Sequence, residues 1–314
     1  MSKKNLPWRL FILTVTIATG TLSVYAKAAA TATDKLQQKT WFSGAKNCQS
    51  DKNPAIEIHQ LNIDTYILRQ NKCIHYEAPF LYLLFGEKRA LLIDTGATKD
   101  KEKFPLAEKV HEIMLQRAKQ LKTETITPPL VIAHSHSHGD HIAADSQFSD
   151  LNEVEIIKVN DTNALISAFA FNNWPIDIAQ IDLGQRIVKI IPTPGHQAQA
   201  ITFYDPQTSL LLTGDSIYPG RLYIRQWQDY KESIKRLVNF TETHNVSAIL
   251  GAHIEMSVLP NVDYPVGSTY HPNEHSLVLS IDDLNKLNRQ LITLGDTAIR
   301  ANLGNMIVYP INNE

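Results

Sequence analysis

The sequence predicts an α/β fold in which two mixed β-sheets pack face to face and helices cover their outer faces. Strand-like runs come first and mixed strands and helices follow, and this order occurs twice along the chain. Such a succession is typical of layered α/β domains. The chain has 314 residues, and no linker divides it after its N-terminal region. We therefore expect one domain over 54–314.

In the first half, short apolar runs rich in β-branched and aromatic residues predict strands. The tetrapeptide 86–89 begins with a glycine and separates two such runs, which predicts a hairpin. Leu106, Val110 and Ile113 recur at helical spacing. The expected elements are strands near 56–58 and 63–68, a hairpin of 80–85 and 90–93, a helix over 104–121 and a strand over 130–133.

The second half follows the same scheme without repeating the sequence. Asp161 and Ser280 precede helical patterns and are expected to cap them. The expected strands are 154–159, 187–191, 200–204, 210–213 and 248–250, and the expected helices are 162–171, 227–243 and 281–294.

The N-terminus has the pattern of a secretory signal peptide. Lys3, Lys4 and Arg9 precede an apolar run over 10–24, and small residues up to Ala26 offer a cleavage site. The run is shorter than the roughly 20 residues of a spanning helix, although an uncleaved anchor is the alternative. We expect a signal peptide over 1–26, a flexible lead-in over 27–53, and a periplasmic or secreted protein without stable membrane insertion after cleavage.

Charge and cysteine content limit the possible partners. The formal net charge is −2, and loss of the signal peptide would make it more negative, so no basic field attracts nucleic acid. The two cysteines, Cys48 and Cys73, either form a disulfide in an oxidising compartment or are two unrelated thiols.

A histidine-rich loop follows the apolar strand 130–133. Within it, His136, His138, Asp140 and His141 form the pattern H-x-H-x-D-H. Imidazole nitrogen and carboxylate oxygen are suitable zinc ligands, and side chains two apart in a turn can converge on one ion. The spacing predicts a metal site to which other parts of the chain must add ligands.

Further metal-binding residue types follow other apolar strands. His196 comes after a Pro-Gly turn, Asp215 after Thr-Gly, His253 after Gly-Ala, and Asp94 directly after the strand at 90–93. Strand ends followed by loops are where a rigid scaffold presents functional side chains.

These motifs, in this order over about 56–260, resemble those of the metallo-β-lactamase superfamily. The resemblance implies an αβ/βα sandwich with metals at the edge of the sheets. It also implies that His136, His138 and His196 bind one metal, that Asp140, His141 and His253 bind a second, and that Asp215 bridges both. Asp94 is then expected to support the ligand loop.

The resemblance further implies a binuclear hydrolase acting on a small molecule. A metal-bridging hydroxide would attack an ester-, thioester-, lactone- or amide-type carbonyl, with Asp140 and Asp215 as the catalytic residues. We expect two divalent ions, zinc in the first place, with iron or manganese also compatible. Tyr218, Tyr223 or His271 would donate to the oxyanion.

Two alternatives stay open on the same fold. Dedicated zinc β-lactamases usually carry Cys or Ser where Asp215 stands, so the chain is closer to the glyoxalase II, lactonase and esterase-like branch, and β-lactamase activity is an alternative. The other is a mononuclear iron oxygenase, against which the intact second ligand set argues.

Two neighbouring features are assigned separately. His134 falls outside the register of the motif, and we expect it to be structural. The Pro- and Gly-bearing segment 264–275 is either a wall of the substrate pocket or a surface loop that leads to the last helix.

Overall fold

The computed structural model describes residues 33–122, 127–159 and 161–311. The signal peptide expected over 1–26 lies outside the described residues and stays a prediction. Within the described ranges, no helix combines the length and apolar character that crossing a membrane requires.

The first sheet has six strands in sequential order. They are β1 (Ile56–Asn62), β2 (Thr65–Gln70), β3 (Phe80–Phe85), β4 (Ala90–Ile93), β5 (Leu130–Ala133) and β6 (Val154–Ile156). The first four strands are antiparallel neighbours, and β4, β5 and β6 are parallel. The antiparallel pairing of β3 and β4 confirms the predicted hairpin.

The second sheet has the order β13-β12-β10-β9-β8-β7. Its strands are β7 (Ala179–Asp182), β8 (Ile187–Pro192), β9 (Ile201–Asp205), β10 (Leu210–Gly214), β12 (Ala248–Gly251) and β13 (Val278–Leu279). Since β9 is antiparallel to both β8 and β10, and β10 is parallel to β12, the strands β8, β10 and β12 run in the same direction.

A third, smaller sheet was not predicted from the sequence. It consists of β11 (Arg221–Ile224), β14 (Ala301–Asn302) and β15 (Ile307–Pro310) in the order β11-β15-β14. These strands are two to four residues long, and β11 is distant in sequence from the other two, so no local periodicity marks them.

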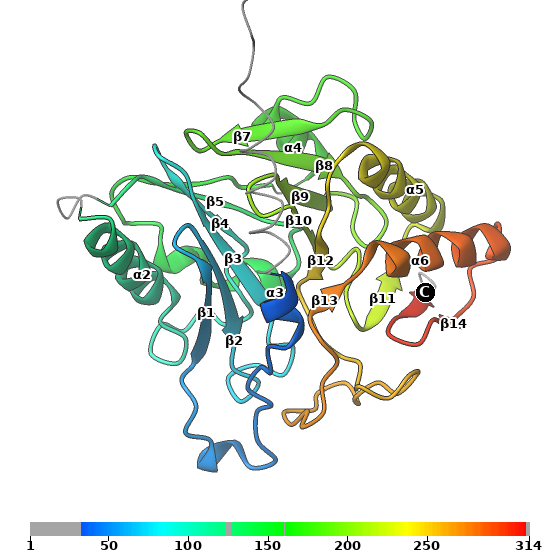
Figure 1. Ribbon diagram of the computed structural model, residues 1–314, viewed down its shortest axis with the longest axis horizontal. Helices are drawn as coiled ribbons and strands as arrows, with labels where there is room; N and C mark the ends of the chain where they lie inside the picture. Colours follow the sequence, from blue (N-terminus) through cyan, green and yellow to red (C-terminus); the bar gives the residue numbers. More distant parts are fainter. Residues whose placement is uncertain (1–32, 123–126, 160, 312–314) are drawn as a thin grey trace, which may run out of the picture.

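The layers follow the predicted order of helix, sheet, sheet, helix (Figure 1). Helix α2 (Leu106–Gln120) covers the outer face of the first sheet, and α5 (Trp227–Thr243) and α6 (Ile281–Leu294) cover that of the second. Buried residues form one core between the sheets and one under each helical layer. The expected αβ/βα sandwich is confirmed.

Strand β3 shows why its sequence is continuously apolar. Tyr82 and Leu84 face the core between the sheets, whereas Leu81 and Leu83 face the core under α2. Side chains alternate between the two faces of a strand, and both faces are covered here.

Helix boundaries agree well with the predicted ones where caps are present. The Ser280 side chain accepts a hydrogen bond from the Asp283 N–H in a capping box, and Asp161 accepts one from the Ala164 N–H before α4 (Thr162–Phe169). The predicted helix 104–121 instead begins at Leu106, because the Phe104 N–H donates to Asp100 in a preceding turn.

The described part of the predicted lead-in, 33–53, packs onto the domain and so differs from the flexible segment expected there. Residues 33–37 are helical, and Leu36 and Trp41 are buried in the core between the sheets. Cys48 and Cys73 form a disulfide, which decides between the two alternatives left open for them.

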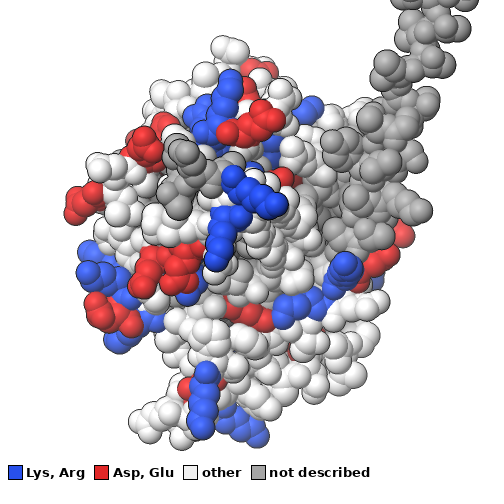
Figure 2. Space-filling model, turned by 60° about the vertical axis from the view of Figure 1, so that its left-hand side comes forward, with Lys and Arg blue, Asp and Glu red and all other residues white. Residues whose placement is uncertain are grey.

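On the face shown in Figure 2, positive and negative side chains are interspersed, and neither sign dominates a large area. This distribution offers no single-sign field on that face that would attract a polyanion.

Candidate metal centre

The predicted ligands meet at one edge of the two sheets. His136 follows β5, His196 follows β8, Asp215 follows β10 and His253 follows β12. The carboxyl ends of parallel strands share one edge of a sheet, so β8, β10 and β12 bring together residues nearly sixty positions apart in sequence.

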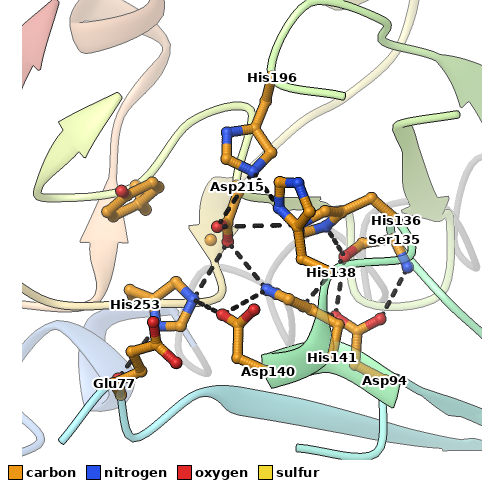
Figure 3. A network of polar contacts seen from close by, with 12 residues as sticks. Glu77, Asp94, Ser135, His136, His138, Asp140, His141, His196, Asp215 and His253 are labelled. Carbon is orange, nitrogen blue, oxygen red and sulfur yellow. Dashed lines mark hydrogen bonds and ion pairs between the residues drawn. The ribbon is translucent and has the colours of Figure 1, made fainter. Parts of the chain in front are cut away.

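One group of potential ligands consists of three histidines. His136 Nε2 and His196 Nε2 both lie 2.9 Å from His138 Nδ1. The three ligand nitrogens lie within 4.8 Å of one another, and their rings are turned edge to face around a common point (Figure 3).

The second group consists of Asp140, His141, Asp215 and His253. Asp140 and His141 lie on the short helix α3 (Gly139–Ile142). Asp140 Oδ2 is 3.1 Å from His141 Nε2 and 3.2 Å from His253 Nε2 (Figure 3). All four ligand atoms lie within 4.8 Å of one another, so they could hold a metal ion.

Asp215 faces both groups with different oxygens. Its Oδ1 lies 3.3 Å from His253 Nε2 and 3.4 Å from His141 Nε2. Its Oδ2 lies 3.6 Å from His196 Nε2 and 4.0 Å from His136 Nε2. Asp215 Oδ1 and His141 Nε2 are buried and have no hydrogen-bond partner in the described part of the chain. Buried polar atoms are normally paired, so these two are available for another ligand.

In three of the imidazoles, Nδ1 points away from the centre and donates a hydrogen bond that fixes the ring. They donate as follows: His141 Nδ1 to Asp94 Oδ2 (2.8 Å), His196 Nδ1 to the Tyr223 carbonyl (2.8 Å) and His253 Nδ1 to the Glu77 carbonyl (3.0 Å). Because carbonyl and carboxylate oxygens only accept, the proton lies on Nδ1 and the Nε2 lone pair of a neutral ring points to the centre.

The ligand loop is held by Asp94, at the end of β4. The Ser135 N–H donates to Asp94 Oδ1 (2.7 Å), and the Ser135 hydroxyl donates to Asp94 Oδ2 (2.8 Å). Gly214, with φ +51°, lets β10 approach this serine, because a Cβ there would lie 2.5 Å from Ser135 Cβ. Ser135 was not predicted from the sequence, where its position between His134 and His136 is the only local signal.

Electrostatics differ between the two groups. Burial lowers the pKa of His136 well below its ordinary value and that of His138 to about 4, and neighbouring imidazoles lower both further, so these rings are neutral. Burial also acts to lower the pKa of His141 and His253, but the carboxylates beside them raise it well above the ordinary value. The second group therefore attracts positive charge.

The family follows from a match that covers the centre. A family model described as "Metallo-beta-lactamase superfamily" matches residues 78–253, more than half of the chain. This chain belongs to the metallo-β-lactamase superfamily.

Among relatives in the superfamily, a human protein named "Acyl-coenzyme A thioesterase MBLAC2" is 23% identical over 55% of this chain and 72% of its own length. A "Hydroxyacylglutathione hydrolase" of Rhizobium etli is 30% identical, over 33% of this chain and 41% of its own length. That of Francisella philomiragia is 24% identical over 70% of this chain and 85% of its own.

Solved structures of superfamily members are also similar. A "Metallo-beta-lactamase from Pontibacter korlensis" aligns with a TM-score of 0.48 and 16% identity, over 76% of this chain and 99% of that one.

In the chain described above, a cavity of about 310 Å³ opens on the two groups of potential metal ligands. Asp140, Asp215 and His253 line its floor. Residues 265–268 and His271 line its wall, so the segment 264–275 forms part of the pocket and is not only a connecting surface loop.

The three residues expected to donate to an oxyanion have different surroundings. The Tyr218 hydroxyl already donates to the Arg221 carbonyl. Tyr223 lines the cavity and accepts from Arg221 Nε (2.9 Å), which leaves its own proton free to be donated. His271 donates Nδ1–H to Glu274 (2.9 Å), so the Nε2 of its neutral ring is an acceptor and is unsuited to that role.

His134 lies outside both groups, as expected. Its Nε2 is 3.2 Å from Asp145 Oδ2, and its ring is buried behind the ligand loop. Its role there is structural.

Proposed function

We propose that this protein is a hydrolase that uses two divalent metal ions to cleave a carbonyl-type bond of a small molecule. The first ion would be held by His136, His138 and His196, the second by Asp140, His141 and His253, and Asp215 would bind both. Zinc is the first candidate because all donors are imidazole nitrogens or carboxylate oxygens, and iron or manganese would also suit them.

The position of Asp215 is the observation that carries this proposal. One of its oxygens faces each group of nitrogens, and Oδ1 is buried without a hydrogen-bond partner among the described residues. A carboxylate in this position fits two cations better than one. The complete second group supports a binuclear centre over a single-iron oxygenase.

The protein groups supply orientation and charge. When bound, two cations would lower the pKa of a water molecule and polarise a substrate carbonyl. The anchored imidazoles already aim Nε2 at the centre, and Asp140 and Asp215 place negative charge in the lining of the cavity. Tyr223 holds a phenolic proton at the cavity wall and is placed to donate it to a developing oxyanion.

Thioesters are the first substrate class to test, with oxygen esters, lactones and amides next. Relatives named as an acyl-coenzyme A thioesterase and a hydroxyacylglutathione hydrolase support this order. An Asp at position 215 supports it over a dedicated β-lactamase, as the resemblance implied.

We also propose that the protein is exported. The basic and apolar pattern of residues 1–26 supports this localisation, and so does the disulfide, because disulfides persist in oxidising compartments.

The test measures metal content and hydrolysis together. Two metal ions per chain and chelator-sensitive cleavage of an acyl thioester, an aryl ester, a lactone or a chromogenic β-lactam are expected. Asp215→Ala should abolish cleavage and lower the metal content, whereas the exposed control Asp150→Ala should do neither. A single iron per chain and no hydrolysis of any substrate would refute the proposal.

A further inference from the structure

A buried lysine lies in the cavity wall, outside both ligand groups. Lys72 follows β2, and its side chain is 1% exposed although it lines the cavity. Its backbone is held on two sides: Cys73, the next residue, carries the disulfide, and a Cβ at Gly44 would lie 2.8 Å from Lys72 Cβ. The position of the ammonium group is therefore fixed by the fold.

Lys72 shares its carboxylate partner with a second buried cation. Glu274 Oε1 lies 3.2 Å from Lys72 Nζ. The same carboxylate already binds Arg69 through two hydrogen bonds, of 2.6 and 2.7 Å, and accepts a third from His271 Nδ1. Since burial lowers the pKa of His271, this ring is neutral, and one carboxylate serves two buried cations.

Lys72 therefore has no carboxylate to itself beside the cavity. Burial lowers the pKa of Lys72 to about 8, and Glu274 offsets only part of that effect. An ammonium group has three donors, and Glu274 is the one ion-pair partner of Lys72 in the described part of the chain. A buried cation without full compensation is costly, so it is characteristic of a site that an anionic ligand completes.

Other carboxylates near the cavity have partners of their own, and Glu77 in its lining lies 3.3 Å from His75 Nδ1 and accepts from the Tyr76 hydroxyl. Glu255 binds Arg221 (2.8 Å), and Arg221 also binds Asp263 (2.7 Å). Apolar side chains, among them Ile254 and Val266, line the same cavity. The cavity thus combines the two groups of potential metal ligands, apolar walls and one ammonium group whose carboxylate partner is shared with Arg69.

We propose that Lys72 binds a carboxylate of the substrate, so that the hydrolysed compound carries both a scissile carbonyl and an anionic group joined through an apolar part. This inference rests on the proposed hydrolase function. A single ammonium group with unused donors suits a monoanion. A cavity of about 310 Å³ is at the lower end of the roughly 300–1,000 Å³ of small-ligand sites, so the substrate is small.

The test compares matched neutral and anionic esters on the metal-loaded protein. One pair has the carboxylate on the acyl side, 4-nitrophenyl hexanoate against the mono-4-nitrophenyl ester of adipic acid. The other has it on the leaving group, phenyl acetate against 4-carboxyphenyl acetate. In the wild type, kcat/KM should favour the anionic member of one pair, which identifies the side that Lys72 recognises. Lys72→Met should lower that preference about 10- to 100-fold, mainly through KM, because a hydrogen bond to a charged group is lost.

The preference is a ratio measured on one preparation, so it does not depend on the fraction of folded or active protein. Removing Lys72 also leaves the Arg69–Glu274 pair balanced, so the variant is expected to fold. The exposed Lys103→Met is the control and should keep the wild-type ratio. Hydrolysis with equal ratios in wild type and Lys72→Met would overturn this inference alone. Absence of hydrolysis of all four esters and of the thioester, lactone and β-lactam as well would overturn the proposed function and this inference with it.

Discussion

The Asp94→Asn substitution tests how the fold sets the orientation of a ligand. Asp94 accepts hydrogen bonds from the Ser135 N–H on Oδ1 and from the Ser135 hydroxyl and His141 Nδ1 on Oδ2. Asparagine has nearly the same shape and tolerates the positive φ of 66° at this position. The substitution therefore changes charge and hydrogen bonding with little change of backbone.

In the variant an amide NH₂ would replace one of the two oxygens. If Oδ1 still accepts from the Ser135 N–H, the amide nitrogen faces His141 Nδ1–H at 2.8 Å, donor against donor. The His141 ring would then favour the tautomer with the proton on Nε2, the atom that faces Asp140 and Asp215. Loss of such a supporting contact typically costs 10- to 100-fold in metal affinity, or about 1.4–2.7 kcal/mol.

The assay is a competitive titration with a chelator of known affinity at neutral pH, which resolves the weaker of the two proposed ions. Asp145→Asn is the matched control, because Asp145 binds the structural His134 (3.2 Å) and the Thr95 hydroxyl (2.8 Å). The control should keep both affinities. Metal affinity within twofold of wild type in Asp94→Asn, or an equal loss in the control, would refute the reasoning.

Three further predictions concern stability. Gly214→Ala should lower the free energy of unfolding by about 2–4 kcal/mol, because the new Cβ adds a clash with Ser135 to the cost of a positive φ. The control Gly295→Ala has a similar φ but open space around it, and it should cost only about 1–2 kcal/mol. Equal losses of stability in urea unfolding would exclude the clash. Replacing Cys48 and Cys73 by serine should lower the free energy of unfolding by about 2–4 kcal/mol, and an unchanged denaturation midpoint would contradict this. Burial acts to raise the pKa of Glu274, but its two cations lower it from 4.5 to about 2. Ionised Glu274 therefore contributes up to about 3 kcal/mol to the free energy of unfolding above pH 4.5, and this contribution is lost as the pH falls through 2. Glu274→Gln should flatten this part of the plot of stability against pH. Parallel plots for wild type and variant would contradict the prediction.

The layered fold could be predicted from the sequence because the patterns that mark its strands and helices are local. The buried strand β3 is continuously apolar, and Ser280 and Asp161 begin their helices as caps. Periodicity and capping depend on neighbours a few residues apart, so a single sequence displays them. The sheet of β11, β15 and β14 was missed because its strands are only two to four residues long and β11 pairs with a strand 86 positions further along, Arg221 opposite Ile307.

The residues proposed as metal ligands were also visible in the sequence. His136 to His141 form a compact motif, and His196, Asp215 and His253 each follow an apolar strand. The structure places all seven in two adjacent groups. The sequence alone determined which residue types are available to a metal centre.

Only the tertiary structure decided what surrounds them. The carbonyls of Glu77 and Tyr223, which orient His253 and His196, are backbone atoms that every residue has, so no sequence pattern could reveal them. Lys72 showed no signal either, because its meaning depends on sharing one carboxylate, about two hundred positions away, with another buried cation. Charge balance and hydrogen-bond satisfaction are properties of residues brought together by folding, and the sequence does not display them until the chain is folded.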